Sequence, residues 1–194
     1  MSRTEVFNRE KVLDKAKNIF WFKGYSGTSM QDLVDETGLN RSSIYNSFGS
    51  KMELYLLTLK KYQEDIDELF ERANQQNRNA IETIGLLFLY VLEDVLEDTE
   101  AKGCMLINCQ TEMGNQDAHL NALFEAYQER LRSMFQRLVT RGQAEGYIRP
   151  DEKSDLLAYY LVNALHGFKI SGMNTKDAVT LKSIIQNILQ TITH

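Results

Sequence analysis

The sequence predicts an all-α protein with a small N-terminal three-helix unit and a larger helical C-terminal domain. The chain of 194 residues contains one proline and 11 glycines, so few positions force a helix to end. Leu, Glu, Lys, Gln and Ala are abundant, and few β-branched residues alternate with polar ones. Hydrophobic residues make up 43% of the chain, which is enough for a substantial core. Together these observations favour long amphipathic helices.

The first two helices have clear start and stop signals. Asn8 is suited to capping a helix that carries apolar residues at helical spacing and ends at Gly24. Thr28 or Ser29 then caps a short helix that Gly38 ends, because glycine readily adopts the left-handed conformation of a helix C-terminus.

A third, short helix follows the turn at Gly38. Asn40 is its predicted N-cap, and Leu39, Ile44 and Phe48 form its inward side. The other side chains of this segment are polar, so its apolar pattern is confined to one face.

A long connecting helix then leads into the C-terminal part of the chain. Ser50 and Glu53 form an S-x-x-E capping box, which starts a helix that runs to about residue 73. The polar run QQNRN at 75–79 follows as a break. The remaining helices are expected at about 79–97, 101–113, 118–145, 152–171 and 175–193.

These elements predict two domains of opposite charge. We expect a helix-turn-helix domain over 1–52, with its connecting helix to about 73, and a regulatory domain over 53–194. The whole chain carries a net charge of −5, but residues 1–62 carry +3 and residues 63–194 carry −8. Bulk charge therefore excludes a general polyanion binder, and any nucleic-acid contact is expected from the first third alone.

The sequence also indicates where the protein is located and which ligands it lacks. The N-terminus lacks the apolar segment of a signal peptide, and the longest apolar run, at 85–92, is too short to span a bilayer. Cys104 and Cys109 are interpreted as thiols of a cytoplasmic protein without a membrane partner. The acidic run at 93–100 has no nearby His or Cys and is interpreted as a solvated helix end, so neither a metal nor a cofactor is expected.

Two short helices joined at Gly38 form the helix-turn-helix pattern, in which the second helix enters the major groove of DNA. Arg41 is suited to a guanine edge, and Asn46 is suited to an adenine edge. The short side chains of Ser42 and Ser43 let the helix approach DNA closely. Tyr45, Lys51 and the N-terminus of the helix that begins near Ser29 are suited to phosphate oxygens. The candidate DNA-binding residues are Ser29, Met30, Arg41, Ser42, Ser43, Tyr45, Asn46 and Lys51. Residue types alone leave open a helical hairpin that binds protein instead.

Residues 20–54 resemble the DNA-binding domain of TetR/AcrR-type transcriptional repressors. The spacing F-x-x-x-G-Y-x-x-T-S, followed by G-L, I-Y-x-S-F-x-x-K and a Leu, matches the family pattern over these 35 residues. Val34 and Thr37 replace two small alanines, and Leu39 and Asn40 replace a Val-Ser pair. The resemblance implies a repressor that binds a palindromic operator in double-stranded DNA as a homodimer. It also implies a C-terminal domain that dimerises and binds an unknown small-molecule inducer.

The last two helices offer a dimer surface. Residues 155–170 are apolar around the whole helix, and residues 181–192 carry a broad apolar stripe. The alternative is that both helices are the core of a monomer, whereas the resemblance implies a four-helix bundle between two copies. The expected interface residues are Leu156, Tyr159, Asn163, His166, Ile170, Leu181, Ile185, Ile188 and Ile192.

Aromatic and sulfur-containing side chains suggest an apolar ligand cavity in the C-terminal domain. Each of them is also consistent with ordinary core packing, which any helical bundle needs. The candidate ligand-binding residues are Phe88, Cys104, Met105, Met113, Phe124, Tyr127 and Tyr160.

The segment KGCMLINCQTEMG at 102–114 resembles a stretch that opens the sixth helix in one branch of this family, some of whose members sense electrophiles or oxidants through a cysteine. Lys102 and a helix start beside Cys104 favour the thiolate, so a thiol-reactive inducer is a second possibility. Cys109 lies about 140° around the helix from Cys104, which disfavours a disulfide between them. The alternatives are two small buried hydrophobes or a thiol-dependent enzyme. The three histidines, His119, His166 and His194, lie in no recognisable catalytic motif, so no enzymatic activity is expected.

Overall fold

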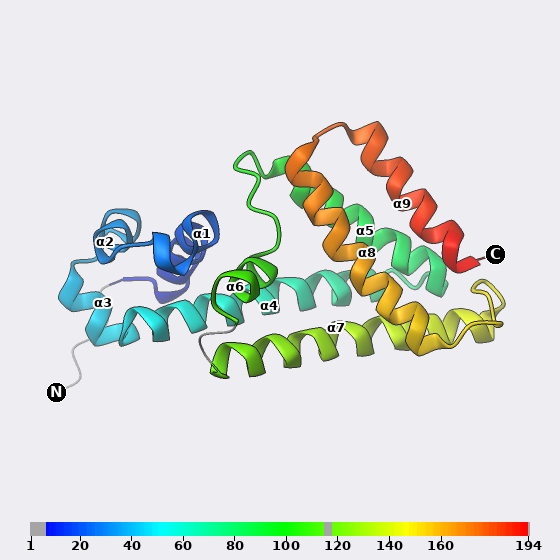
Figure 1. The fold of residues 1–194 in the computed structure, drawn as a ribbon, viewed down its shortest axis with the longest axis horizontal. Coiled ribbons are helices and arrows are strands. Elements are labelled where there is room, and N and C mark those ends of the chain that lie inside the picture. The colour runs from blue at the N-terminus through cyan, green and yellow to red at the C-terminus, as the bar shows by residue number, and fades with distance from the viewer. Residues whose placement is uncertain (1–6, 115–117, 194) are drawn as a thin grey trace.

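The computed structural model describes residues 7–114 and 118–193, and in these residues the only regular secondary structure is helical (Figure 1). The all-α prediction is therefore confirmed. The helices are α1 (Arg9–Gly27), α2 (Met30–Thr37), α3 (Arg41–Phe48), α4 (Lys51–Asn74), α5 (Ala80–Glu97), α6 (Met105–Met113), α7 (Ala118–Glu145), α8 (Ser154–Asn174) and α9 (Ala178–Thr193).

Side-chain caps start the first four helices, as the sequence predicts. The Asn8 side chain accepts a hydrogen bond from the Lys11 backbone N–H, and Asn40 does the same for Ser43. Ser29, and not Thr28, caps α2 in a capping box with Asp32. Ser50 and Glu53 form the predicted capping box at the start of α4. Such caps satisfy backbone donors that have no partner inside the helix.

Two helix boundaries differ from the prediction because of left-handed residues. Gly24 interrupts α1 with φ 74° and ψ 173°, but one more helical turn follows it to Gly27. Helix α6 begins at Met105 instead of residue 101, because Ala101 (φ 54°) and Gly103 (φ 69°) keep the preceding segment out of the helix.

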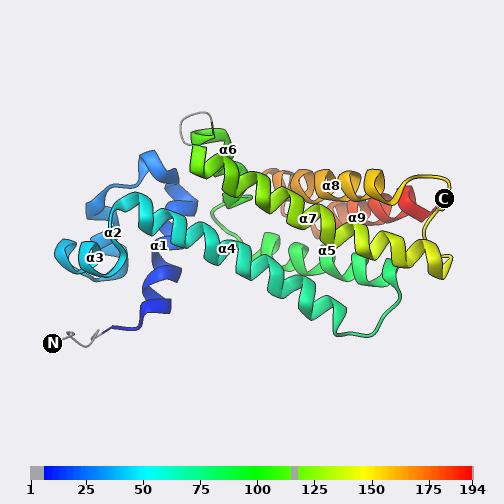
Figure 2. The same ribbon diagram turned by 90° about the horizontal axis from the view of Figure 1, so that it is seen from below.

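Helices α1, α2 and α3 form a small unit against the first half of α4, and α4 continues from this unit into the rest of the molecule (Figure 1). The view turned by 90° shows α5, α7, α8 and α9 gathered beside the later part of α4, away from α3 at its start (Figure 2). Helix α5 contacts α4, α7, α8 and α9, so it lies at the centre of this larger unit, called the body below.

Apolar packing is continuous through both units. Phe20 of α1 lies 4.9 Å from Tyr55 of α4, measured between ring centroids, and Phe70 near the other end of α4 lies 5.2 Å from Phe135 of α7. The same helix thus joins the core of the small unit to that of the body. No helix in the described ranges is long and apolar enough to cross a membrane.

Candidate nucleic-acid interface

The turn between α2 and α3 is held by local hydrogen bonds. Gly38 adopts a left-handed conformation (φ 75°, ψ 6°), and its N–H donates to the Val34 carbonyl. The Thr37 hydroxyl donates to the Leu33 carbonyl and accepts from the Leu39 N–H. A glycine at this position lets the chain reverse without the steric cost that a side chain would add.

Helix α3 is anchored on one face. Ile44 and Phe48 are buried, with 0% and 4% of their surface exposed. The Arg9 guanidinium lies 4.4 Å from the centre of the Phe48 ring and donates to the Ser47 carbonyl at 2.8 Å. Sequence reasoning missed Arg9, because a contact across 38 residues leaves no local pattern.

The opposite face of α3 is free to meet a partner. Arg41, Ser42, Tyr45 and Asn46 are exposed, while Ser43 is half-buried. Among the described residues the Arg41 guanidinium has no hydrogen bond or ion pair, so its donors are available to another molecule. The four exposed predicted contacts thus share one surface.

The N-terminus of α2 is already occupied by a carboxylate. Asp32 accepts from both the N–H and the hydroxyl of Ser29, and the Lys23 ammonium lies 2.6 Å from its other oxygen. The hydrogen bond from Lys23, followed by those from Ser29, holds the pKa of Asp32 well below its usual range. A phosphate at Ser29 would have to compete with Asp32, and Met30 is half-buried against the core.

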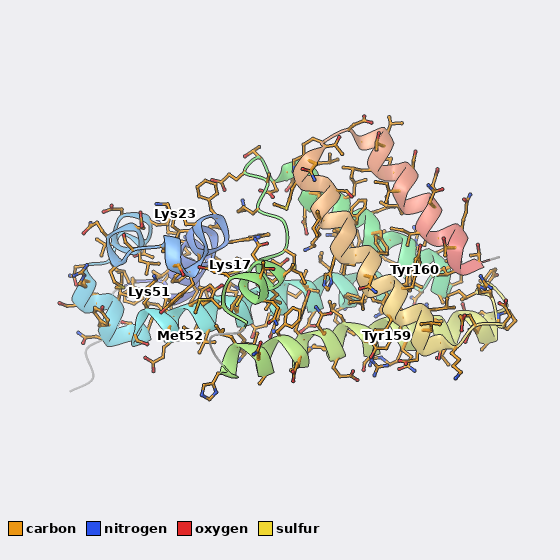
Figure 3. The ribbon with its side chains drawn as sticks, in the orientation of Figure 1. Lys17, Lys23, Lys51, Met52, Tyr159 and Tyr160 are labelled. Atoms are coloured by element: carbon orange, nitrogen blue, oxygen red, sulfur yellow. The ribbon has the colours of Figure 1, made fainter. Side chains whose placement is uncertain are left out.

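Lys51 faces the helical unit and not the outer surface of α3. Lys51 is the first residue of α4 (Figure 3), and its ammonium lies 4.2 Å from the centre of the Tyr25 ring. Burial lowers the pKa of Lys51, and the carboxylates of Glu112 and Asp32 oppose that shift. A phosphate contact by Lys51 therefore requires the side chain to leave this ring.

Helix α6, which packs on α7 of the body, contacts the small unit at the break in α1. The Glu112 carboxylate accepts from the backbone N–H groups of Tyr25 at 2.9 Å and Ser26 at 2.7 Å. Gly24 has a positive φ of 74°, which side chains rarely tolerate, and a Cβ there would also lie 2.7 Å from a Glu112 oxygen and displace the carboxylate. Burial acts to raise the pKa of Glu112, but the bonds from Ser26 and Tyr25 outweigh it and the pKa is lowered. We call this contact the Glu112 clamp.

The predicted dimer residues divide between surface and core. On α8, Leu156 (54%), Tyr159 (51%) and Ile170 (49%) are exposed, as is Asn163, while His166 is half-buried. Tyr159 lies where α8 passes α7 (Figure 3). On α9 the apolar stripe packs against the core of its own chain. The buried members are Leu181, Ile185, Ile188 and Ile192.

The predicted ligand residues belong to the closed core. Five of the seven are buried, and Phe124 and Tyr160 are half-buried. None of the seven lines the cavity of about 600 Å³ that the described residues enclose. That cavity is formed by α1, α4, α8, the end of α5 and the segment before α6, and no local sequence signal predicts it. The core residues are Phe88, Cys104, Met105, Met113 and Tyr127.

Cys104 occupies the N-cap position of α6 and is 3% exposed. Its sulfur accepts a hydrogen bond from the Tyr62 hydroxyl at 3.6 Å, and the Lys169 ammonium donates to the same hydroxyl at 2.8 Å. Lys102, expected to favour the thiolate, instead forms ion pairs with Asp98 and Glu100.

Cys109 is a second buried thiol of α6. Within the described ranges, no group of His, Cys, Asp and Glu side chains is arranged to hold a metal ion.

Comparison with known proteins matches both units. Residues 12–57 match the family model described as bacterial regulatory proteins, tetR family. Residues 81–188 match the model described as tetracyclin repressor-like, C-terminal domain.

Individual relatives cover most of the chain. The uncharacterised HTH-type transcriptional regulator YezE of Bacillus subtilis is 29% identical over 162 residues, which are 83% of this chain and 84% of YezE. The HTH-type transcriptional repressor ComR of Escherichia coli is 29% identical over 187 residues, 95% of this chain and 87% of ComR. A solved TetR transcriptional regulator from Chloroflexus aurantiacus is 28% identical with a TM-score of 0.82, covering 96% of this chain and 94% of its own.

Proposed function

This chain belongs to the TetR family of bacterial regulatory proteins, and we propose that it is a transcriptional repressor that binds a palindromic operator as a homodimer. A small-molecule or thiol-reactive inducer releases it by favouring a conformation that fits the operator poorly. The function is that of a DNA-binding regulator and not of an enzyme, and its place of action is the cytoplasm.

The observation that supports this proposal best is the exposed face of α3. The guanidinium of Arg41 is suited to a guanine edge in the major groove, and the amide of Asn46 is suited to an adenine edge. Ser42 permits close approach, and Tyr45 supplies a hydroxyl for a phosphate. The buried face, with Ile44 and Phe48, holds the helix at a defined angle on its support.

A second copy of the chain is needed because one hairpin contacts too few bases and phosphates for specific affinity. The exposed apolar residues of α8 provide a surface for pairing, and they continue onto α9 at Val179, which is 73% exposed. We infer that Leu156, Tyr159 and Ile170 lie in this interface. Two-fold pairing then places two α3 helices on the two half-sites of a palindrome.

The Glu112 clamp gives the body a direct contact with the DNA-binding unit. A ligand that moves α6 acts on the break in α1 through Tyr25 and Ser26, and thereby changes the position of α3. Modification of Cys104 acts at the other end of the same helix, where this residue occupies the N-cap position of α6.

The experiment that tests this function is selection of bound DNA from a random pool by the full-length protein. A palindromic consensus with two half-sites one helical turn apart, or a multiple of it, is expected. Binding should weaken steeply with added salt, because each neutralised phosphate releases counterions. Recovery of no enriched sequence would contradict the proposal, as would a consensus without two-fold symmetry.

A further inference from the structure

The cavity of about 600 Å³ lies between the DNA-binding unit and the body. Trp21 and Lys17 of α1 form one wall, and Lys169 and Met173 of α8 form another. Tyr62 of α4 lies in the wall between them. Its size falls within the usual range for small-molecule sites in proteins.

A buried ammonium group lies in the wall of this cavity. Lys169 is only 6% exposed, and its Nζ donates to the Tyr62 hydroxyl at 2.8 Å. No ion pair joins Lys169 to a carboxylate of the described residues. Burying an ammonium beside a neutral hydroxyl is costly, and an anion at this position would offset that cost.

A second hydrogen-bond donor lies beside the first. The Trp21 Nε1 atom is buried and has no hydrogen-bond partner among the described residues. The Trp21 ring packs edge-on against Tyr62 at 5.1 Å between centroids, and Trp21, Tyr62 and Lys169 all line the cavity. Unpaired buried donors are rare, so the site favours a ligand that carries acceptors.

The remaining cations of the cavity wall are already engaged. Lys17 pairs with Asp65 at 2.5 Å, and Lys102 pairs with Asp98. Lys176 donates to the Val95 carbonyl at 2.6 Å, and the Arg72 guanidinium lies 3.8 Å from the centre of the Tyr90 ring. One buried cation is therefore left for one negative charge.

Other lining residues restrict the remainder of the ligand. Glu68, Asp94 and Glu97 are exposed carboxylates of the same wall, and they disfavour ligands with several negative charges. Although Asp94 is exposed as a residue, partial desolvation of its carboxyl group raises the pKa of Asp94, and the charge of Lys169 opposes that shift. Apolar lining comes from Ile66, Leu69, Val95 and Met173.

We propose that this cavity binds a small organic acid with one carboxylate and an apolar remainder. The carboxylate accepts hydrogen bonds from the Lys169 ammonium and the Trp21 indole N–H, and the apolar part contacts Leu69 and Met173. Such a ligand contacts α1 and α8 at once. Its identification as the inducer rests on the function proposed above, whereas its binding does not.

The sole tryptophan of the chain is Trp21, so its fluorescence reports binding directly. The full-length protein is titrated with hexanoate, octanoate and decanoate, and in parallel with the matching primary amides. We expect a saturable change of emission and a rise of the thermal midpoint with at least one acid, and a response about tenfold weaker or absent with its amide, because a bond to a charged group is stronger. No saturable response to any acid up to its solubility limit would overturn the proposal, as would equal responses to acid and amide.

Two variants locate the site. Lys169→Met keeps the aliphatic length and removes the charge, so it should weaken binding of the responding acid about tenfold or more while raising the thermal midpoint. The matched control is Lys182→Met, on the exposed side of α9, which should bind like the unmodified protein. Trp21→Phe, followed by thermal shift, removes the indole donor without touching the lysine and should also weaken binding. If Lys169→Met binds the acid with unchanged affinity, the assignment is refuted. If Lys169→Met does not fold, unchanged affinity of Trp21→Phe for the acid refutes it instead. Neither measurement involves DNA, so failure here is distinct from failure of operator binding.

Discussion

Replacing Glu112 with Gln tests the contact between the body and the DNA-binding unit. The carboxylate now accepts two backbone hydrogen bonds, from Tyr25 and Ser26. The amide has a single acceptor oxygen and no charge, so one bond is lost and the other is weakened. Bonds to charged groups contribute about 1.5–3 kcal/mol and neutral ones about 0.5–1.5 kcal/mol. Because the side chain is only half-buried, we take the low end and expect a loss of about 1–2 kcal/mol.

The measurement is thermal and urea unfolding of Glu112→Gln beside the unmodified protein. For a chain of this length the loss corresponds to a fall in melting temperature of about 2–8 °C. Hydrogen exchange at the amides of Tyr25 and Ser26 should also become faster, because these donors lose their acceptor. The control is Glu125→Gln on the exposed surface of α7, which should leave both quantities unchanged.

The pH dependence gives an independent check on the clamp. The pKa of Glu112 is lower in the folded protein than its ordinary value of 4.5. The stabilisation is therefore fully present above pH 4.5 and is lost as the pH falls through the lower, folded-state pKa. Glu112→Gln should lose stability less steeply in that acidic range. Equal stability of the two proteins at neutral pH, with identical acid profiles, would refute the reasoning.

Four further predictions follow from other parts of the molecule. Gly24→Ala should destabilise the protein by about 1–3 kcal/mol in urea unfolding, because its backbone angles are almost exclusive to glycine. Arg41→Ala should weaken binding to the selected operator by about 1–3 kcal/mol and relax one base position, as measured by fluorescence anisotropy; an unchanged base preference would contradict its role. Leu156→Glu should shift the protein from dimer to monomer in sedimentation experiments, and a persistent dimer would place the interface elsewhere. Cys104 should react slowly with alkylating agents because it is 3% exposed. If the alkylated protein binds the operator unchanged, the thiol is not the sensor.

Much of the fold follows from signals that act over a few residues. A side chain such as Asn8 or Ser50 caps a helix by bonding to a backbone group three positions later, so the cap is readable in the sequence. The same is true of the turn at Gly38 and of the division of α3 into a buried and an exposed face. These local interactions explain why the hairpin and the exposed face of α3 were predictable.

Contacts between distant segments were not predictable in this way. The apolar stripe of α9 indicates that one face of this helix is buried, but it does not indicate which segment packs against it. In the tertiary structure this face packs against the core of the same chain. Glu112 meets Tyr25 across 87 residues, and Lys169 meets Tyr62 across 107. The sequence by itself determined the helices, the helix-turn-helix unit and the family. Only the tertiary structure decided which polar groups are buried together, because that depends on how complete helices pack and on which charges the packing leaves without a partner.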